Sequence, residues 1–468
     1  MNTGRIAAGC MAAAVVMAAG AASAGLLDNA WIKGTTDKDP VSYKVGEEMV
    51  FTLTPMGLDG EVPAGEYSLM VKRSDDFVYG KEEKFPFDGQ PFVYKTKIDR
   101  PGFVRLEAYV VDKKGKRVKK QFTGDTTTPE GRKAMNKFEK AKKDVFFDGG
   151  AGAEIEKLAA PEEPKDFDAY WQKQFARLAK VKIPSFDKLE KAEVEHKNTK
   201  VRMYAVSIPC VDGIRPVTGY LTIPKAVDQG KKFPVRLETH GYGIGSIHQP
   251  QPWSTDQEIV LNINAHGMKL PALGGTDADF EELKKAVKSN GKSYAFDPEQ
   301  NKDPTTAYFN GMVLRVKRGL QFLKSLDGWN GKDVRANGGS QGGLQTIWAA
   351  GCGEGVLRAN SDITWCCDLP YNQLRLDKKA ASAGWYIPWS PGLAYFDAAT
   401  WAKRIPTTCR TNVTRAGLGD YTCPPMGLAK MYNNIPGTNK SIKWVQGSEH
   451  GYVPPEYPGR DFMKEASK

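Results

Sequence analysis

The stretch VRANGGSQGG (residues 334–343) contains the pattern G-x-S-x-G within a chain of 468 residues. Residues 333–336 before it are typical of a short buried strand, and residues 344–350 after it are typical of a helix. A tight strand-to-helix turn lifts a serine hydroxyl to a helix N-terminus, where the next backbone amide faces a developing oxyanion. The pattern therefore predicts Ser340 as a nucleophile and the amide of Gln341 as an oxyanion donor. The alternative is a glycine-rich turn around a buried serine.

From about residue 190 the chain alternates short apolar segments with helical ones. This alternation predicts an α/β fold with a doubly wound, mostly parallel sheet that helices cover on both faces. We expect a leading hairpin followed by six strands, with the longest helix at 306–326. The predicted strands are 203–208, 217–224, 233–239, 258–264, 334–336, 363–367, 411–416 and 442–445.

A serine hydroxyl needs a base, and the base needs a carboxylate that orients it. In this kind of fold the chain order is serine, acid, histidine. His450 is the one histidine after Ser340, so it is the predicted base. Asp420 follows a predicted strand and is the expected acid. Asp368 is its rival, and Glu449 would have to fold back to reach the neighbouring histidine.

The second oxyanion donor is expected in a loop after an early strand. Thr239-His240-Gly241-Tyr242-Gly243 follows the predicted strand 233–239 and has the form of such a loop. We assign the donor to the amide of Tyr242. His240 precedes Ser340 in the chain, so a structural role suits it better than that of the base.

Residues 25–127 lack this alternation and instead show period-2 strands separated by turn signals. Such a pattern predicts an all-β sandwich, immunoglobulin-like, that is accessory to the chemistry. Residues 128–160 are predicted to be a linker with a turn-rich break at 147–152. An amphipathic helix at 166–179 then opens the α/β domain, residues 161–468.

Residues 1–24 are typical of a cleavable signal peptide, with Arg5 before an apolar run and Ala22-Ser23-Ala24 at its end. We therefore expect a periplasmic or secreted protein without a membrane span. The net charge of +11 becomes +10 without the signal, because Arg5 is its one charged residue. Basic residues do not alternate with aromatic ones, so no nucleic-acid partner is predicted. Six cysteines remain, and disulfides and buried thiols both stay open.

Several of these motifs resemble one known family. His240-Gly241-Tyr242, Gly338 to Gly343, Gly417 to Asp420 with Cys423-Pro424-Pro425, and His450 are similar to the acetyl xylan esterase and cephalosporin-C deacetylase family, carbohydrate esterase family seven of the α/β-hydrolase superfamily. The resemblance covers roughly residues 160 to 460. Two positions differ, because Asn264-Ala265-His266-Gly267 stands where the family usually has Arg-Gly-Gln-Gly, and Gly451 follows His450 in place of Glu.

The resemblance implies a secreted serine esterase that removes acetyl groups from xylan-type polysaccharide or acetylated oligosaccharides. Its catalytic residues would be Ser340, Asp420 and His450, with Tyr242 and Gln341 as oxyanion donors. No cofactor and no metal is expected, and the substrate would be an acetylated carbohydrate. Homo-oligomerisation stays open. The alternatives are a secreted serine peptidase of the prolyl-oligopeptidase type and a non-catalytic carbohydrate-binding or scaffold protein.

Overall fold

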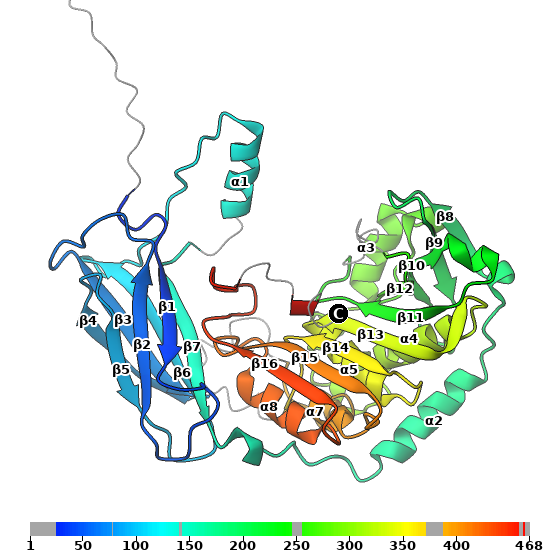
Figure 1. Ribbon diagram of the computed structural model, residues 1–468. Coiled ribbons are helices and arrows are strands. Elements are labelled where there is room, and N and C mark those ends of the chain that lie inside the picture. The colour runs from blue at the N-terminus through cyan, green and yellow to red at the C-terminus, as the bar shows by residue number, and fades with distance from the viewer. Residues whose placement is uncertain are drawn as a thin grey trace, which may run out of the picture.

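The computed structural model describes residues 25–76, 78–139, 143–245, 255–370, 387–457 and 462–463 (Figure 1). The predicted signal peptide, residues 1–24, lies outside the described residues. Among the helices described, none combines the length and the apolar character that crossing a membrane requires. The chain forms an N-terminal β-region (residues 25–153) beside an α/β-region, and Figure 1 shows the β-region next to the sheet edge that carries strand β16.

The α/β-region contains a nine-stranded sheet in the order β16-β15-β14-β13-β11-β12-β10-β9-β8. The six strands from β11 to β16 run parallel, whereas β8, β9 and β10 pair antiparallel. The predicted leading hairpin and the mostly parallel sheet are therefore confirmed. The strands are β8 (Glu190–Val194), β9 (Val201–Ile208), β10 (Val217–Pro224), β11 (Phe233–Thr239), β12 (Ile259–Asn264), β13 (Trp329–Gly339), β14 (Arg358–Asp362), β15 (Arg410–Gly417) and β16 (Lys440–Val445).

Helices bury their apolar sides against this sheet in one large hydrophobic core. The longest helix, α4, also buries basic side chains, and each donates to a backbone carbonyl: Arg315 to Ala265 at 2.9 Å and Lys317 to Cys352 at 2.7 Å. A buried cation needs such partners because it has left water. The helices are α2 (Phe167–Ala179), α3 (Asp277–Ala286), α4 (Tyr308–Lys324), α5 (Gln341–Gly351), α7 (Ala398–Ala402) and α8 (Pro425–Asn434).

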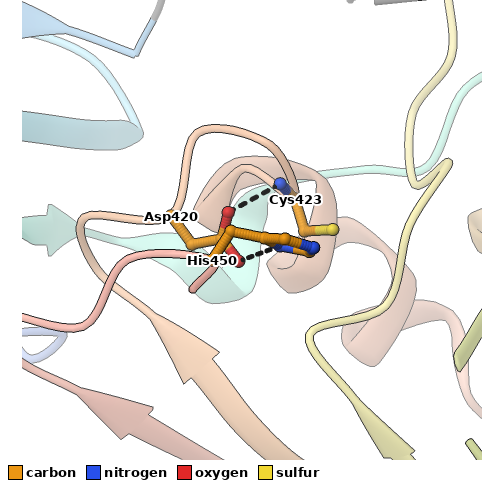
Figure 2. A group of neighbouring side chains, drawn as sticks. All are labelled: Asp420, Cys423 and His450. Carbon is orange, nitrogen blue, oxygen red and sulfur yellow. Dashed lines mark hydrogen bonds and ion pairs between the residues drawn. The ribbon is translucent and has the colours of Figure 1, made fainter. Parts of the chain in front are cut away.

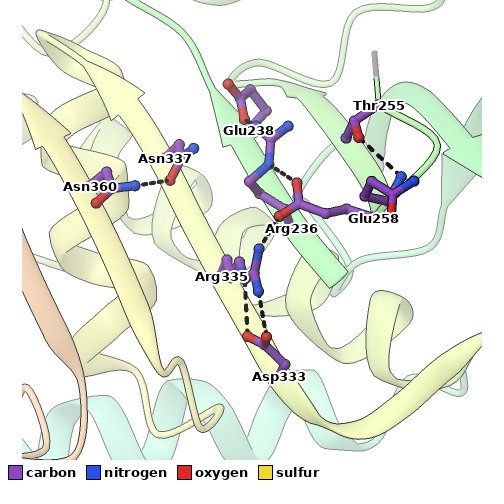
Figure 3. Close-up of polar contacts among 9 residues, drawn as sticks. Arg236, Glu238, Thr255, Glu258, Asp333, Arg335, Asn337 and Asn360 are labelled. Carbon is purple, nitrogen blue, oxygen red and sulfur yellow. Dashed lines mark hydrogen bonds and ion pairs between the residues drawn. The ribbon is translucent and has the colours of Figure 1, made fainter. Parts of the chain in front are cut away.

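Polar side chains connect neighbouring strands of the sheet (Figure 3). Glu258, just before β12, accepts from Arg236 Nε at 2.7 Å and also pairs with Arg335 of β13. Asn360 of β14 donates to Asn337 of β13 at 3.1 Å. Because β13 carries the glycine-rich turn at its end, these contacts help to fix the strand that presents Ser340.

The N-terminal β-region consists of two antiparallel sheets, in the orders β1-β2-β5 and β4-β3-β6-β7. Apolar residues from both sheets share one hydrophobic core. The all-β character of this part is as predicted, and the immunoglobulin-like topology stays a prediction. The strands are β1 (Trp31–Thr36), β2 (Met49–Met56), β3 (Tyr67–Asp75), β4 (Val78–Pro86), β5 (Phe92–Thr96), β6 (Gly102–Asp112) and β7 (Phe146–Ala153).

Strand β7 differs from our expectation, which placed a linker at 128–160 and a turn-rich break at 147–152. The linker range holds a short helix, α1 (Pro129–Glu139), and β7 pairs along its length with β6. Glycines weaken strands in general, but here they make room. A Cβ atom at Gly150 would lie 2.3 Å from the carbonyl oxygen of Val104, so a side chain could not fit. The strand was missed because its glycines suggest a turn, whereas they are needed where β7 lies close to the backbone of β6.

The predicted strand at 363–367 is wrong. The strand at this point is β14, which ends at Asp362, and the following residues Ile363, Cys366 and Asp368 have φ angles of 40°, 56° and 61°. Such left-handed angles are incompatible with a strand. The segment is apolar because it packs into the core next to the Ser340 turn, and burial alone does not distinguish a strand from a buried loop.

The cysteines in the described residues include five free thiols, at Cys210, Cys352, Cys366, Cys367 and Cys409. Burial raises the pKa of Cys352 to about 12 and that of Cys409 to about 11. Buried thiols with raised pKa values are poor nucleophiles, because the thiolate is the reactive form.

Candidate active site

Ser340 occupies a strained turn between β13 and α5. Its φ and ψ angles are 57° and −119°, a conformation that a residue with a side chain rarely adopts. Three backbone hydrogen bonds hold it: Ser340 N–H donates to Asp362 at 2.9 Å, and its carbonyl accepts from Leu344 and Trp365, both at 3.1 Å. Strain fixed by surrounding bonds is typical of a nucleophile at the end of a strand.

The glycines around Ser340 are required by close contacts with strand β11. A Cβ atom at Gly338 would lie 2.2 Å from Thr239 Oγ1, and one at Gly342 would lie 2.7 Å from the Thr239 carbonyl oxygen. Thr239 Oγ1 in turn donates to the Gly342 carbonyl at 2.8 Å. The turn can therefore pack directly onto the end of β11, from which the predicted oxyanion loop begins.

Asp420 and His450 form a hydrogen-bonded pair (Figure 2). Nδ1 of His450 lies 2.9 Å from Oδ2 of Asp420. The other carboxylate oxygen accepts from the backbone N–H groups of Thr422 at 3.0 Å and Cys423 at 2.9 Å. The Asp420 side chain is fully buried, whereas that of His450 is 29% exposed. This is the arrangement of a carboxylate that orients an imidazole open to the site.

The rival acid, Asp368, has a different partner. Lys430 Nζ lies 2.5 Å from Asp368 Oδ2, and both side chains are largely buried. The backbone N–H of Asp368 donates to Asp397 at 3.0 Å. Asp368 thus belongs to a local ion pair. Between these two aspartates, the geometry favours Asp420 as the acid.

The group Asp420, Cys423 and His450 offers three ligand atoms within 4.8 Å of one another, a spacing that also suits a metal ion. The hydrogen bond between Asp420 and His450 accounts for their proximity without a metal. Cys423 comes close because its backbone N–H caps the same carboxylate.

The predicted oxyanion loop lies against the serine turn. A Cβ atom at Gly241 would lie 4.0 Å from the Cβ of Ser340, so the loop backbone passes directly beside the serine. The Tyr242 ring stacks on Tyr294 with centroids 4.4 Å apart and meets the edge of Trp365 at 5.6 Å. The aromatic packing anchors the loop whose amide we predicted as a donor.

Tyr294 is a residue that sequence reasoning missed. Its hydroxyl donates to Gln341 Oε1 at 2.8 Å and accepts from the backbone N–H of Gly243 at 3.1 Å. It therefore joins the residue after Ser340 to the oxyanion loop. Tyr294 lies between helices, 47 residues before Gln341, and nothing in the local sequence around it marks this contact.

His266 packs next to Tyr294 and Tyr308. The His266 and Tyr294 rings pack edge to face with centroids 4.4 Å apart, and Nδ1 of His266 lies 2.8 Å from the Tyr308 hydroxyl oxygen. Burial, helped by the positive charges of Arg315 and Arg215, lowers the pKa of His266 to about 3. The enclosed imidazole therefore packs as a neutral ring against Tyr294, which contacts the predicted oxyanion loop.

The site residues converge at one edge of the sheet. Ser340 follows β13, Asp420 follows β15 and His450 follows β16, and these strands are parallel. The carboxyl ends of parallel strands meet at the same edge, where α/β proteins bind their ligands. Tyr242 joins them from the end of β11.

The chain is similar to known acetyl xylan esterases and acetyl esterases. Residues 154–380 match the acetyl xylan esterase family model, a range that includes Tyr242, Ser340 and Gln341 and ends before Asp420 and His450. The acetyl esterase Axe7A of Xylanibacter ruminicola is 28% identical over 297 residues, which cover 60% of this chain and 62% of that protein. The chain thus spans less than two thirds of the length of this relative.

Two solved structures show the same fold at 20% identity, and each covers 67% of this chain. The acetyl xylan esterase 1 of Thermoanaerobacterium sp. matches over 95% of its own chain with a TM-score of 0.54. The acetyl xylan esterase of Paenibacillus sp. R4 matches over 98% of its chain with a TM-score of 0.50. The nine-stranded sheet is therefore that of the α/β-hydrolase fold. The match of residues 154–380 to the acetyl xylan esterase family model confirms the predicted resemblance to this family.

Proposed function

We propose that this protein is an exported serine esterase that removes acetyl groups from xylan-type plant polysaccharide or from acetylated oligosaccharides. The observation that carries the proposal is the Asp420–His450 hydrogen bond at the sheet edge that also presents the strained Ser340 turn. The similarity to the acetyl xylan esterase family supports the esterase activity, and the similarity to an acetyl esterase supports an acetyl ester as the bond that is cleaved.

In the proposed mechanism, Ser340 Oγ attacks the acetyl carbonyl carbon while His450 accepts the hydroxyl proton. Asp420 holds the imidazole with its proton on Nδ1, so that Nε2 is free to act as the base. The negative oxygen of the tetrahedral intermediate is bound by the amides of Tyr242 and Gln341.

Collapse of this intermediate breaks the bond between the acetyl carbon and the sugar oxygen, which takes the proton from His450 and leaves as a hydroxyl group, so that an acetyl ester remains on Ser340. A water molecule that His450 deprotonates then attacks that ester and releases acetate. Each of these steps uses only groups of this chain and water.

The acyl group is expected to be small. The backbones of Gly241 and Trp365 lie next to Ser340, and the rings of Tyr242 and Trp365 are nearly perpendicular with centroids 5.6 Å apart. Rings fixed in this way would form a wall close to the serine, which leaves room for a methyl group and little more. An added methylene changes binding by about 1–3 kcal/mol, and against a closed wall the change is unfavourable. We expect acetate esters to be cleaved ahead of butyrate esters, with little activity on octanoate.

A chromogenic aryl acetate tests the function. Wild type should hydrolyse it, and Ser340→Ala and His450→Ala should each lower kcat by about 10⁴-fold, because the triad acts as a unit. A tenth of wild-type activity in either folded variant would remove the assignment. Hydrolysis of a peptide amide by wild type would indicate a peptidase instead. A wild type that hydrolyses neither substrate would favour a non-catalytic binding protein. Acetate release from acetylated xylan, mannan and pectin then shows which carbohydrate is the substrate.

A further inference from the structure

Strand β7 of the N-terminal β-region lies against both loops that carry the acid–base pair. The loop after β15 bears Asp420 and the loop after β16 bears His450. The two loops are bonded to each other, because Gly419 N–H donates to the Ser448 carbonyl at 3.1 Å. Both then meet the same strand. In Figure 1, β7 stands beside the β16 edge of the large sheet.

Gln446 connects the His450 loop to β7. Its side-chain oxygen accepts from the Gly150 N–H at 2.9 Å, and its side-chain nitrogen donates to the Gly150 carbonyl at 2.9 Å. The amide thus pairs with β7 as a neighbouring strand would, across 296 residues of sequence. Its side chain is almost fully buried, so water cannot replace these bonds.

Asp148 of β7 is the contact to the Asp420 loop. A Cβ atom at Gly419 would lie 2.0 Å from the Asp148 backbone oxygen, so the residue before Asp420 touches the strand directly. The Asp148 carboxylate accepts two hydrogen bonds from Arg105 of β6, at 2.8 and 2.5 Å. The same guanidinium lies 4.2 Å from the ring centroid of Tyr421, the residue after Asp420.

The charges at this contact are enclosed. Burial raises the pKa of Asp148 to about 6, the nearby carboxyl of Glu449 adds to the rise, and Arg105 acts in the opposite direction. Glu449 is the residue before His450, so the β7 carboxylate also faces the base loop. An apolar cluster continues the contact, with Phe103 of β6 packed on Trp444 of β16 at a centroid distance of 5.4 Å.

We propose that the N-terminal β-region positions Asp420 and His450, with Gln446, Arg105 and Asp148 as positioning residues and β7 as the surface on which both loops rest. This inference rests on the proposed function, since it assigns a role to the acid–base pair. It replaces our sequence-based expectation that this region is merely accessory. Gly149 and Gly419 are explained together, because a Cβ atom at Gly149 would lie 2.2 Å from Gln446 Oε1 and one at Gly419 would lie 2.0 Å from the Asp148 backbone oxygen.

Gly419→Ala in the full chain tests the proposal. The φ angle of Gly419 lies outside the left-handed region, so alanine fits the backbone and only β7 obstructs it. We expect kcat for an aryl acetate to fall by about 10²-fold with KM nearly unchanged, because displaced catalytic groups lose reactive geometry. The matched control is Gly451→Ala, next to His450, where a Cβ atom meets nothing within 4 Å. It should keep kcat within about threefold of wild type.

Gln446→Leu and Arg105→Met probe the same contact without overpacking. Each should lower kcat by about tenfold or more, and Arg105→Lys should recover part of the loss because it keeps a charge beside Asp148. All variants are compared well below their unfolding temperatures, so that a loss of folded protein is not read as a loss of kcat.

The proton NMR spectrum gives a readout independent of turnover. A proton held between His450 and Asp420 should give a far-downfield signal that is missing in His450→Ala. We expect Gly419→Ala and Gln446→Leu to shift or broaden it and Gly451→Ala to keep it. An unchanged signal and unchanged kcat in folded Gln446→Leu and Arg105→Met would overturn the positioning role. An inert wild type with the expected signal changes would instead refute the esterase and leave the positioning intact.

Discussion

At the residue scale, the two candidate acids differ in the side chains to which they bond. Asp420 is fully buried and bonded to His450, whereas Asp368 pairs with Lys430. An asparagine at position 420 would turn an amide N–H toward Nδ1 and force the proton of His450 onto Nε2. Nε2 could then no longer accept a proton from Ser340. We expect Asp420→Asn to lower kcat by about 10⁴-fold, measured with an aryl acetate.

Asp368→Asn is the matched control for this variant. Removing the carboxylate takes one ion-pair partner from the nearly buried ammonium group of Lys430, so we expect the free energy of unfolding to fall by about 3 kcal/mol. Its kcat should stay close to that of wild type in the folded protein. The opposite order of the two effects on kcat would transfer the role of the acid to Asp368.

Tyr294 permits a second prediction at this scale. Tyr294→Phe keeps the ring that stacks on Tyr242 but removes the hydroxyl that joins Gln341 and Gly243. The Gln341 side chain and the Gly243 N–H then each lose this hydrogen bond, and the two predicted oxyanion donors lose a common support. We expect kcat to fall by about tenfold, or about 1.4 kcal/mol, with little change in KM.

Tyr308→Phe is the comparison for this change, because it removes a hydroxyl from the same aromatic group. Tyr308 bonds to His266 and Arg215 and does not take part in the bond to Gln341. Equal losses of kcat in the two variants would mean that aromatic packing, and not the link between the donors, matters here.

At the element scale, the turn between β13 and α5 depends on contact with β11. Gly338→Ala would place a Cβ atom 2.2 Å from Thr239 Oγ1 and 2.4 Å from the Gly342 carbonyl oxygen. Overpacking of this kind typically reduces stability by about 1–3 kcal/mol, and urea unfolding measures the change. Gly339→Ala is the matched control, since its nearest neighbours would be at 3.6 Å or more. We expect its stability to change by less than about 1 kcal/mol.

At the scale of the whole molecule, the buried histidine couples stability to pH. The pKa of His266 is lowered by burial from 6.5 to about 3, so the unfolded chain binds a proton that the folded chain does not. The contribution of neutral His266 to the free energy of unfolding is fully present above about pH 6.5 and is lost as the pH falls toward 3. Between pH 7 and pH 5 it amounts to about 2 kcal/mol.

His266→Gln isolates that contribution, because glutamine does not titrate and is the residue that the related family usually has here. Urea unfolding of both proteins at pH 7 and pH 5 should show a smaller acid loss in the variant. Wild type and variant are compared because Asp397 also titrates. Burial raises the pKa of Asp397 to about 7, so this residue increases stability as the pH falls, opposite to His266. Parallel pH profiles would mean that His266 is protonated in the folded protein.

The sequence by itself determined the mostly parallel sheet and the helices α2, α4 and α5, because a buried strand or an amphipathic helix leaves a local apolar pattern. It also singled out the Ser340 turn and the HG loop. His450 was predicted because it is the one histidine that follows Ser340. These features depend on short stretches of chain and on chain order.

Only the tertiary structure decided which aspartate meets His450, that Tyr294 joins the oxyanion loop to Gln341, and that a glycine-rich segment is strand β7. Each depends on contacts between residues far apart in the chain, such as Gln446 and Gly150. A glycine in a turn and a glycine beneath a neighbouring backbone look the same in a sequence. The difference lies in the atoms that a Cβ would meet, and those come from other parts of the fold.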